Sequence, residues 1–385
     1  MISQNFSLFG SSVVGFAVVW YITLETSSGV WMMLAMLCNL VPQVLVSLFA
    51  GVWADRHNRK HLIMLADGFI AMATLALAAS FLLGFRKMEL MLVVLAVRAI
   101  GASVQTPAVN AVYPQLVPEE RLTKVQGINQ TIGSVSALIT PAIGGLLLGT
   151  VGVVGAFFVD VVTAAIAIAI MSSIRIGRPP WPPDRSVWKE IGAGISYLKG
   201  HAQLRRLMIC LLFMFLFVTP AFTLTPLLIE RNFGNEVWRL TVHEIVWSSA
   251  MIASGVFVSI KSKFNDKPRT IALCIVGSGV LFALMGMSWD FISFLVFLGV
   301  AGLFWPVFST MQTVFVQETV PPEMLGRVFS VIQLIMTGTV PIAILFYGPL
   351  ADVLPMGIIY LISSALLAAV GVVYGFSERK RSHNL

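Results

Sequence analysis

Long apolar stretches alternate with short polar segments along the whole chain. A helix needs about 20 apolar residues to cross about 30 Å of hydrocarbon, and twelve stretches approach or exceed that length. They are too long and too uniformly apolar for the strands of an outer-membrane barrel, which alternate over segments of about ten residues. The pattern therefore predicts an all-α integral membrane protein. Its twelve transmembrane helices are expected at residues 3–24, 30–53, 61–84, 90–112, 125–147, 153–174, 207–229, 242–260, 270–288, 291–316, 328–350 and 356–376.

The longest polar stretch, residues 175–206, divides the expected helices into six and six. It opens with a Pro-rich segment, 178–183, which cannot be helical because proline lacks an N–H donor. An amphipathic helix on the inner membrane surface is predicted over 186–200 by helical spacing of Val187, Ile191, Ile195 and Leu198. The expected domains are an N-terminal six-helix bundle at 1–174, a cytoplasmic linker at 175–206, a C-terminal six-helix bundle at 207–376 and a cytoplasmic tail at 377–385.

Composition agrees with a membrane protein and excludes several other classes. Of the 385 residues, 57% are hydrophobic and 11% are charged, with a mean hydropathy of +0.89. Soluble domains carry about 25% charged residues, so a soluble enzyme, a secreted disulfide scaffold and a disordered protein are all excluded. The three cysteines, Cys38, Cys210 and Cys274, lie inside apolar runs and are interpreted as small buried hydrophobic residues. No metal site, disulfide framework or cofactor is expected.

The basic residues indicate how the chain is oriented in the membrane. With the N-terminus inside, the inner loops and tail hold 20 of the 25 Lys and Arg residues. The outer loops hold Arg86, Lys87, Arg231 and Arg239. By the positive-inside rule both termini are cytoplasmic, and the net charge of +7 reflects this asymmetry rather than a nucleic-acid partner. An aromatic belt at the outer helix ends is expected from Trp20, Trp31, Trp238 and Trp289. We expect a multi-pass membrane protein.

The two halves of the chain resemble each other. Residues 117–125 align with residues 320–328, with five of nine positions identical and Lys opposite Arg at a sixth. A parallel six-plus-six duplication is typical of secondary transporters whose two bundles rock about a central site. The fold expected from the repeat is therefore two pseudo-symmetric six-helix bundles.

The loop between the second and third predicted helices, residues 51–60, resembles the signature G-x-x-A-D-R-x-G-R-K of the major facilitator superfamily. Asn58 replaces the second glycine, a mild change because Asn also tolerates left-handed backbone. The resemblance implies a gating role. Gly51 would allow close helix approach, Asp55 would face the helix N-terminus near Gly326 and Arg327, and the basic residues would hold the two halves in one conformation. The matching gating residues are Gly51, Asp55, Arg56, Arg59, Lys60, Gly326 and Arg327.

Three ionisable residues lie well inside the predicted helices: Asp67, Arg98 and Asp160. Charges inside a bilayer are costly, so each is a functional candidate. At 1.5 Å per residue, Arg98 and Asp160 lie at roughly the same depth from the outer end, about 10–12 Å, and can pair. Asp67 lies about 10 Å from the inner face. A permanent ion pair that fixes helix packing and a carboxylate that binds and releases a proton remain alternatives, and either aspartate is a candidate for the proton site.

Further motifs narrow the resemblance to drug:proton antiporters. Arg98 corresponds to the arginine of their R-x-x-Q-G motif, although the glutamine is absent here. Residues 140–145 resemble G-P-x-x-G-G with Thr140 in first place, and Pro141, Gly144 and Gly145 would kink the helix and permit close crossing. Segments 106–124 and 325–330 are similar to the macrolide efflux (Mef-type) branch, and siderophore exporters form a neighbouring branch. Relatives begin a few residues earlier, so a shortened or misassigned start is expected; a signal peptide is not.

The resemblance implies a secondary exporter of amphiphilic drugs, above all macrolides, that exchanges them for protons by alternating access. Export of an endogenous metabolite such as a siderophore, or transport of a lipid, is the alternative. An amphiphilic substrate would bind aromatic faces and a few polar groups, although aromatic residues in membrane helices also commonly face lipid or neighbouring helices. The candidate cavity residues are Gln43, Gln130, Phe217, Phe222 and Trp305.

Other classes of function receive less support. All five histidines are expected at loops or tails and no H-E-x-x-H motif occurs, which disfavours a membrane-embedded enzyme. No G-x-x-x-x-G-K-[ST] motif occurs, so an ATP-driven pump would need an ATP-binding partner. A receptor lacks any large signalling domain to support it. The expected partners are a small amphiphilic substrate, protons and the lipid bilayer, with a monomer favoured over a complex with an ATP-binding efflux partner.

Overall fold

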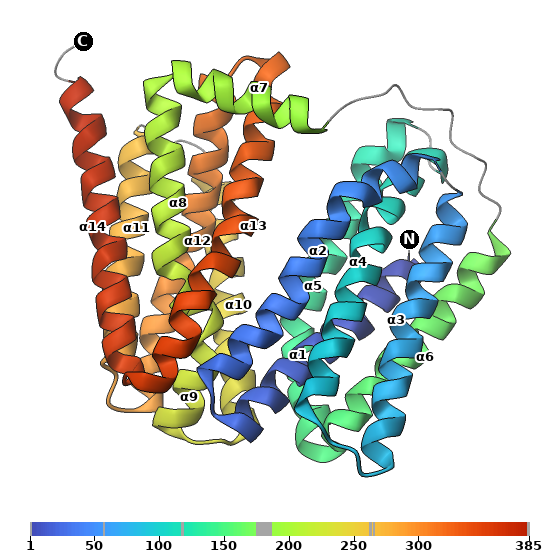
Figure 1. Ribbon diagram of the computed structural model, residues 1–385. Coiled ribbons are helices and arrows are strands. Elements are labelled where there is room, and N and C mark those ends of the chain that lie inside the picture. The colour runs from blue at the N-terminus through green and yellow to red at the C-terminus, as the bar shows by residue number, and fades with distance from the viewer. Residues whose placement is uncertain are drawn as a thin grey trace. The chain divides into compact units, whose positions relative to one another are not determined.

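The computed structural model describes residues 2–56, 58–116, 119–174, 187–261, 264 and 266–382. Within these ranges the chain forms fourteen α-helices and no strand (Figure 1). The helices are α1 (Ile2–Thr26), α2 (Gly29–Arg56), α3 (Arg59–Leu82), α4 (Met88–Leu116), α5 (Glu119–Thr150), α6 (Gly152–Ser173), α7 (Val187–Gly200), α8 (Ala202–Thr223), α9 (Thr225–Phe233), α10 (Val237–Ile260), α11 (Lys267–Gly286), α12 (Phe291–Thr319), α13 (Pro322–Val353) and α14 (Met356–Ser382).

Among the described residues, eleven of these helices are long and apolar enough to cross a membrane. The remaining candidate is α5, where the apolar stretch is limited to Ile139–Thr150 in the part of the chain that the structure describes. The predicted all-α membrane fold is therefore confirmed. The Pro-rich segment 178–183 lies outside the described residues, and α7 follows it.

One expected helix is divided in the structure. The span predicted at 207–229 consists of α8 and the short α9, with Leu224 between them. Pro220 lies inside α8, and Pro226 lies in the first turn of α9. Because proline cannot donate a backbone hydrogen bond and its ring crowds the preceding turn, a helix tends to end near such a residue. Hydropathy alone does not detect this break because Leu224, Leu227 and Leu228 are apolar and fully buried.

The chain forms two compact units. The first contains residues 1–26, 34–185 and 236–242, and the second contains residues 27–33, 186–235 and 243–385. In the first unit, α1 packs along α6, and α3 packs against both α4 and α6. The crossing of α1 and α6 is close at Gly10, where a Cβ atom would lie 3.2 Å from the Cα atom of Asp160. This glycine brings the next residue, Ser11, up to the buried carboxylate of Asp160.

Large side chains fill the core of the first unit. Phe81 and Phe157 meet edge to face with ring centroids 5.7 Å apart. Trp20 is buried against Phe16, with ring centroids 3.7 Å apart. Trp20 therefore does not belong to the expected aromatic belt, because an interfacial tryptophan must reach the membrane surface. Trp238 and Trp289, by contrast, are exposed.

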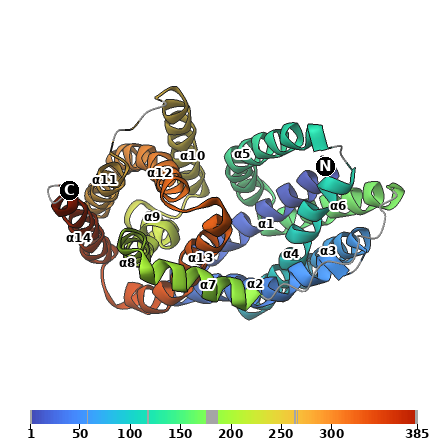
Figure 2. The same ribbon diagram turned by 90° about the horizontal axis from the view of Figure 1, so that it is seen from above.

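In the second unit, α11 packs against α14 and α12, and α8 packs against α13 and α14 (Figure 2). The contact between α11 and α14 is built on glycine. A Cβ atom on Gly279 would lie 2.8 Å from the backbone nitrogen of Ala368 and 2.8 Å from the carbonyl oxygen of Ser364. Small residues allow membrane helices to approach backbone to backbone, so van der Waals packing stabilises this contact where the hydrophobic effect supplies little.

Candidate functional site

The first unit contains a buried ion pair between Arg98 of α4 and Asp160 of α6. Two hydroxyl groups also donate hydrogen bonds to the carboxylate of Asp160. Ser11 donates to Oδ1 at 2.9 Å, and Thr74 donates to Oδ2 at 2.9 Å. The Arg98 guanidinium also donates to Thr74 and, at 3.3 Å, to the carbonyl oxygen of Ser11. Four helices, α1, α3, α4 and α6, therefore converge on this pair.

The pairing of Arg98 with Asp160 agrees with their predicted equal depth. Asp160 is 0% exposed and Arg98 is 8% exposed, so water screens their attraction little. Removing either partner alone would leave a buried charge without compensation, which is strongly destabilising. We call the group formed by Ser11, Thr74, Arg98 and Asp160 the arginine cluster.

Asp67 of α3 occupies a different environment. Its carboxylate accepts hydrogen bonds from Ser7 Oγ at 2.5 Å, Gln105 Nε2 at 2.6 Å and Gln4 Nε2 at 3.2 Å. Gln105 also donates to Gln4 Oε1 at 3.2 Å, which closes the network. Asp67 is 1% exposed, and within the described part of the chain no cation forms an ion pair with it. We call this group the Asp67 cluster.

The two aspartates therefore differ in a way that the sequence did not reveal. The charge of Asp160 is balanced by a guanidinium, whereas Asp67 is held by neutral donors alone. Burying a carboxylate without a counter-ion is expensive, and taking up a proton removes that charge. Gln4, Ser7 and Gln105 were not predicted as site residues. The available signal was the helical spacing, because Gln105 lies two turns beyond Arg98 on α4 and so shares its face.

The candidate gating residues are only partly visible. The side chains of Gly51, Asp55 and Arg56, at the end of α2, lie outside the described part of the chain. Lys60 Nζ donates to the carbonyl oxygens of Ser172 at 2.6 Å and Ile174 at 2.7 Å. These carbonyls lie at the C-terminus of α6, where a cation is favoured by the helix dipole. In this structure Lys60 therefore stabilises a helix of its own unit, and a wider gating role for it stays a prediction.

Two further gating candidates lie at the start of α13. Arg327 is exposed, and its guanidinium lies 3.1 Å from the sulfur of Met324 one turn away. Gly326 is also exposed, and a Cβ atom there would meet nothing within 4 Å. Arg59, at the start of α3, is half-buried. Their predicted gating role stays untested by this arrangement.

The candidate kink residues lie in α5. Pro141 is inside the helix and buried. Gly144 and Gly145 are buried against α1, where their Cβ atoms would lie 3.1 Å from Phe16 Cδ1 and 3.2 Å from Trp20 Cζ3. The two glycines thus permit the close crossing of α5 and α1 that the sequence suggested.

An aromatic cluster occupies the second unit. The rings of Phe222 and Trp305 meet at 4.9 Å, and Phe222 also contacts Trp247 at 5.5 Å and Phe282 at 6.2 Å. Two of the five candidate cavity residues are therefore neighbours, joined by two aromatic residues that were not predicted. Phe217 lies apart from them and stacks on Phe213 at 6.1 Å.

The two glutamines proposed for the cavity belong to the first unit. Gln43 is exposed, and its backbone carbonyl accepts a hydrogen bond from Ser103 at 3.3 Å. Gln130 belongs to α5, but its side chain lies outside the described residues.

One histidine departs from expectation. His243 was expected in a loop or tail like the other histidines, yet it lies in the second turn of α10 and is buried. Its Nδ1 is 3.7 Å from the carboxylate of Glu244, and its ring lies 6.2 Å from that of Phe294. The expected start of this helix, residue 242, came five residues too late because Arg239 and other polar residues interrupt the apolar pattern. His243 and Glu244 are therefore ionisable residues inside a helix, in addition to Asp67, Arg98 and Asp160.

A polar cluster at the start of α2 was also missed. Asp352 accepts hydrogen bonds from the backbone nitrogens of Gly29 at 2.7 Å and Val30 at 3.0 Å, and from Ser28 Oγ at 2.7 Å. Arg231 of α9 forms an ion pair with the same carboxylate at 2.9 Å. A carboxylate at a helix N-terminus satisfies orphan N–H donors and complements the helix dipole. Asp352 therefore caps α2 although it lies at the other end of the chain.

This fold, with its buried charges and lipid-length helices, defines a multi-pass membrane protein. The family model of the Major Facilitator Superfamily matches residues 1–343. The chain belongs to this superfamily, as its loop motif suggested.

Similarity to individual proteins extends over almost the whole chain. Macrolide efflux protein A from Streptococcus pyogenes is 30% identical over 376 residues, which cover 96% of this chain and 93% of that protein. The Staphyloferrin A transporter from Staphylococcus aureus is 22% identical and covers 98% and 95%, respectively. Among solved structures, a bacterial homologue of the iron transporter ferroportin has a TM-score of 0.71 at 14% identity, covering 97% of this chain and 98% of that one. A structural likeness at this identity supports the fold alone.

Proposed function

We propose that this protein is a secondary active exporter of amphiphilic drugs, with macrolide antibiotics as the first substrate class to test. The observation that carries the proposal is the similarity to Macrolide efflux protein A over nearly the full length of both proteins. The buried ionisable groups support it further, because intramembrane charges in transporters mark ion and substrate pathways. Export would exchange the drug for protons by alternating access of the two bundles.

We assign the proton to Asp67. Its neutral surroundings suit a carboxylate that changes charge during the cycle: it accepts a proton to become a carboxylic acid and later releases it. The three donors around it can stabilise the carboxylate, and Ser7 can turn its hydroxyl to accept from the acid instead. No ion pair has to break for this exchange, in contrast to Asp160.

The arginine cluster has a different role in this proposal. Asp160 is held by a guanidinium and two hydroxyl groups, so its protonation would leave Arg98 buried without its counter-ion. We propose that the cluster fixes α1, α3, α4 and α6 in a rigid bundle. Ser7 and Ser11 lie one turn apart on α1, so a shift of this helix would move a hydrogen-bond donor in each cluster.

The experiment measures labelled erythromycin in efflux-deficient cells that express the chain, with and without a proton uncoupler. Low accumulation that the uncoupler reverses is expected for proton-driven export. Unchanged accumulation, with the protein verified in the membrane, would reject macrolides as substrates.

Two variants connect the transport to Asp67. Asp67→Asn keeps the size of the side chain and resembles its protonated form, with one acceptor oxygen and one donor group. It cannot bind or release a proton, and it is expected to abolish drug-driven proton release from proteoliposomes. Asp290→Asn is the matched control, because Asp290 is exposed, caps α12 by accepting from Ser293, and Asn caps helices equally well. Normal proton release by Asp67→Asn would reject the assignment.

A second substrate class is favoured by a separate observation. Besides the Staphyloferrin A transporter, the relatives include the Enterobactin exporter EntS from Shigella boydii, 29% identical over 290 residues. Siderophores are polar iron chelators, whereas macrolides are large amphiphilic molecules. Competition by an added siderophore against erythromycin efflux would distinguish shared from separate substrates.

The proposal also covers the location of the protein, its orientation in the membrane and its oligomeric state. We place the protein in the bacterial inner membrane with both termini in the cytoplasm, working as a monomer without an ATP-binding partner. The residues of the 51–60 loop would gate the cycle, together with Gly326 and Arg327. The aromatic cluster around Phe222 and Trp305 would provide the apolar face for the drug.

A further inference from the structure

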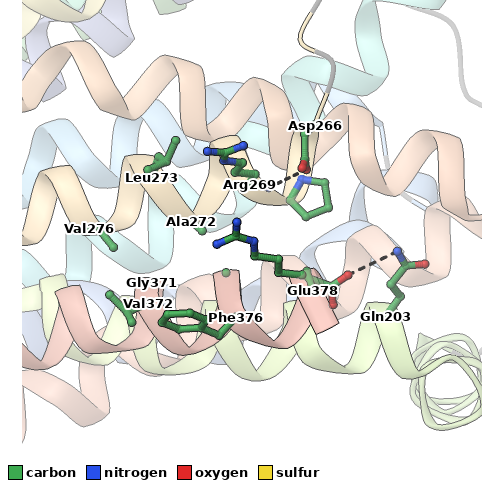
Figure 3. A pocket seen from close by; sticks show the side chains of 13 residues that line it. Gln203, Asp266, Arg269, Ala272, Leu273, Val276, Gly371, Val372, Phe376 and Glu378 are labelled. Atoms are coloured by element: carbon green, nitrogen blue, oxygen red, sulfur yellow. Dashed lines mark hydrogen bonds between the residues drawn. The ribbon is translucent and has the colours of Figure 1, made fainter. Parts of the chain in front are cut away.

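A groove of about 690 Å³ runs along the contact between α11 and α14 in the second unit (Figure 3). This volume is in the range of small-molecule sites, about 300–1,000 Å³. Its apolar part is lined by Ala272, Leu273, Val276, Gly371, Val372 and Phe376. The groove is remote in sequence from the arginine cluster and the Asp67 cluster, both of which belong to the first unit.

Glycine forms the floor of this groove. A Cβ atom on Gly371 would lie 2.8 Å from Val276 Cγ2, and one on Gly375 would lie 3.1 Å from Ala272 Cβ. The two helices are therefore in close contact along the floor, while larger side chains stand beside it. Leu273 is 59% exposed and Phe376 is 62% exposed, so these apolar walls face outward. In a bilayer, such surfaces contact acyl chains.

One end of the groove is polar. Figure 3 shows Asp266 and Arg269 of the α11 end near Gln203 and Glu378, whereas Val276, Gly371 and Val372 lie further along. Arg379 also lines this end. Seven residues of α11 separate Arg269 from Val276, a rise of about 10 Å. The groove thus combines a charged end with an apolar channel about two helical turns long.

The two carboxylates at the polar end are already engaged. Asp266 caps α11 by accepting from the backbone nitrogen of Arg269 at 3.0 Å. Glu378 lies 2.9 Å from Arg206 Nε, and Gln203 donates to it at 3.5 Å. Among the ion pairs of the described residues, none includes the guanidinium of Arg269 or Arg379. These two arginines favour an anion.

We propose that this groove is a binding site for an anionic phospholipid, with the phosphate at Arg269 and Arg379 and an acyl chain along the channel between α11 and α14. The charge complements a phosphate headgroup, and the exposed apolar walls complement a lipid chain. By the positive-inside rule this end lies at the cytoplasmic leaflet, where anionic lipids and basic pockets between helices meet.

The test measures lipid retention by native mass spectrometry of the full-length protein purified in a mild detergent. Phosphatidylglycerol is titrated, with phosphatidylcholine of the same chains as the neutral comparison. Wild type is expected to retain phosphatidylglycerol preferentially. The double variant Arg269→Gln/Arg379→Gln is expected to bind it roughly 10- to 30-fold more weakly, from the loss of two basic groups at the surface.

The matched control is Lys199→Gln/Arg205→Gln. It removes the same charge from an exposed residue at the end of α7 and one in the first turn of α8, both outside the groove lining, and is expected to retain the lipid as wild type does. Equal weakening in both double variants would mean a general charge effect and would overturn the site.

A third variant tests the channel itself. Val372 is 43% exposed and lines the groove, so Val372→Trp fills it without entering the core. Loss of phosphatidylglycerol with both arginines intact is expected. Retention of lipid by this variant, or displacement of the lipid by inorganic phosphate alone, would show that a surface phosphate site rather than a lipid groove is present and would overturn the proposal. Unchanged thermal unfolding of each variant verifies that it is folded.

Discussion

At the scale of single residues, the arginine cluster and the Asp67 cluster differ by one guanidinium group. Arg98 forms an ion pair with Asp160, whereas Asp67 accepts hydrogen bonds from neutral donors. The negative charge of Asp160 is therefore compensated by a cation, and the negative charge of Asp67 is not. Stability measurements can test this difference between the two aspartates independently of transport.

We expect Asp160→Asn to lower the free energy of unfolding by about 3–5 kcal/mol, because it leaves Arg98 buried without a counter-ion. Asp67→Asn removes no ion pair and is expected to cost about 1 kcal/mol or less. Thermal and denaturant unfolding of the purified variants in one detergent gives the comparison. Equal destabilisation by the two substitutions would contradict the different environments described for them.

A charge-free double variant separates structure from function in the arginine cluster. Replacing a buried ion pair by apolar residues of similar volume is often neutral for stability. We therefore expect Arg98→Met/Asp160→Leu to regain most of the stability that Asp160→Asn loses. If the cluster only fixes packing, efflux returns with stability; if efflux stays absent in the stable double variant, the charges take part in the cycle itself.

The sequence predicted the Arg98–Asp160 pair because depth along a helix follows from residue count alone. It could not predict the partners of Asp67, because Gln4, Ser7 and Gln105 are ordinary polar residues whose importance depends on how α1 and α4 are rotated. His243 was missed for a related reason. It is the second residue of the span predicted at 242–260, and the observed start of α10 at Val237 moves it from the helix end to the second turn.

At the scale of helices, glycine sets the close approach of α11 and α14. We expect Gly279→Val to destabilise the protein by about 1–3 kcal/mol, since its side chain would meet the backbone of Ala368 and Ser364 rather than a flexible side chain. Gly255→Ala is the control, because a Cβ atom there meets nothing within 4 Å. Alanine also favours a helix more than glycine does, so this control should be neutral or slightly stabilising. Unfolding midpoints of the two variants are compared.

A second expectation at this scale concerns the cap of α2. Asp352→Ala removes the acceptor for the backbone nitrogens of Gly29 and Val30 and should cost about 1 kcal/mol of stability, typical of a lost N-cap. Glu236→Gln provides the comparison, because its ion pair with Arg239 is at the surface and such pairs contribute little. A loss for Asp352→Ala no larger than that for Glu236→Gln would contradict the capping role.

The helices themselves were largely predictable, because a membrane-spanning helix leaves a stretch of about 20 apolar residues in the sequence. The division of α8 from α9 was not, since both sides of Leu224 are equally apolar. The capping of α2 by Asp352 was also beyond the sequence, because the two segments are more than 300 residues apart. Hydropathy predicts which residues enter the membrane, but it does not predict contacts between distant helices.

At the scale of the whole molecule, membership of the Major Facilitator Superfamily and the charge asymmetry of the loops give complementary information. The family accounts for a multi-pass transporter, whereas the positive-inside rule supplies the direction in which the chain is inserted. That direction matters for two proposals. It decides from which side Asp67 receives its proton, and it places the charged end of the groove at the cytoplasmic leaflet.

The insertion direction can be measured with single cysteines. In a variant with Cys38, Cys210 and Cys274 replaced by Ser, we introduce Lys87→Cys in the α3–α4 connection or Lys199→Cys in α7, both at exposed positions. A membrane-impermeant maleimide should label the cysteine at position 87 in intact cells. The one at position 199 should react only after permeabilisation, because seven of the 25 basic residues lie between 175 and 206 and hold that segment inside. The reverse pattern would invert the topology and remove the argument that anionic lipids of the cytoplasmic leaflet reach Arg269 and Arg379.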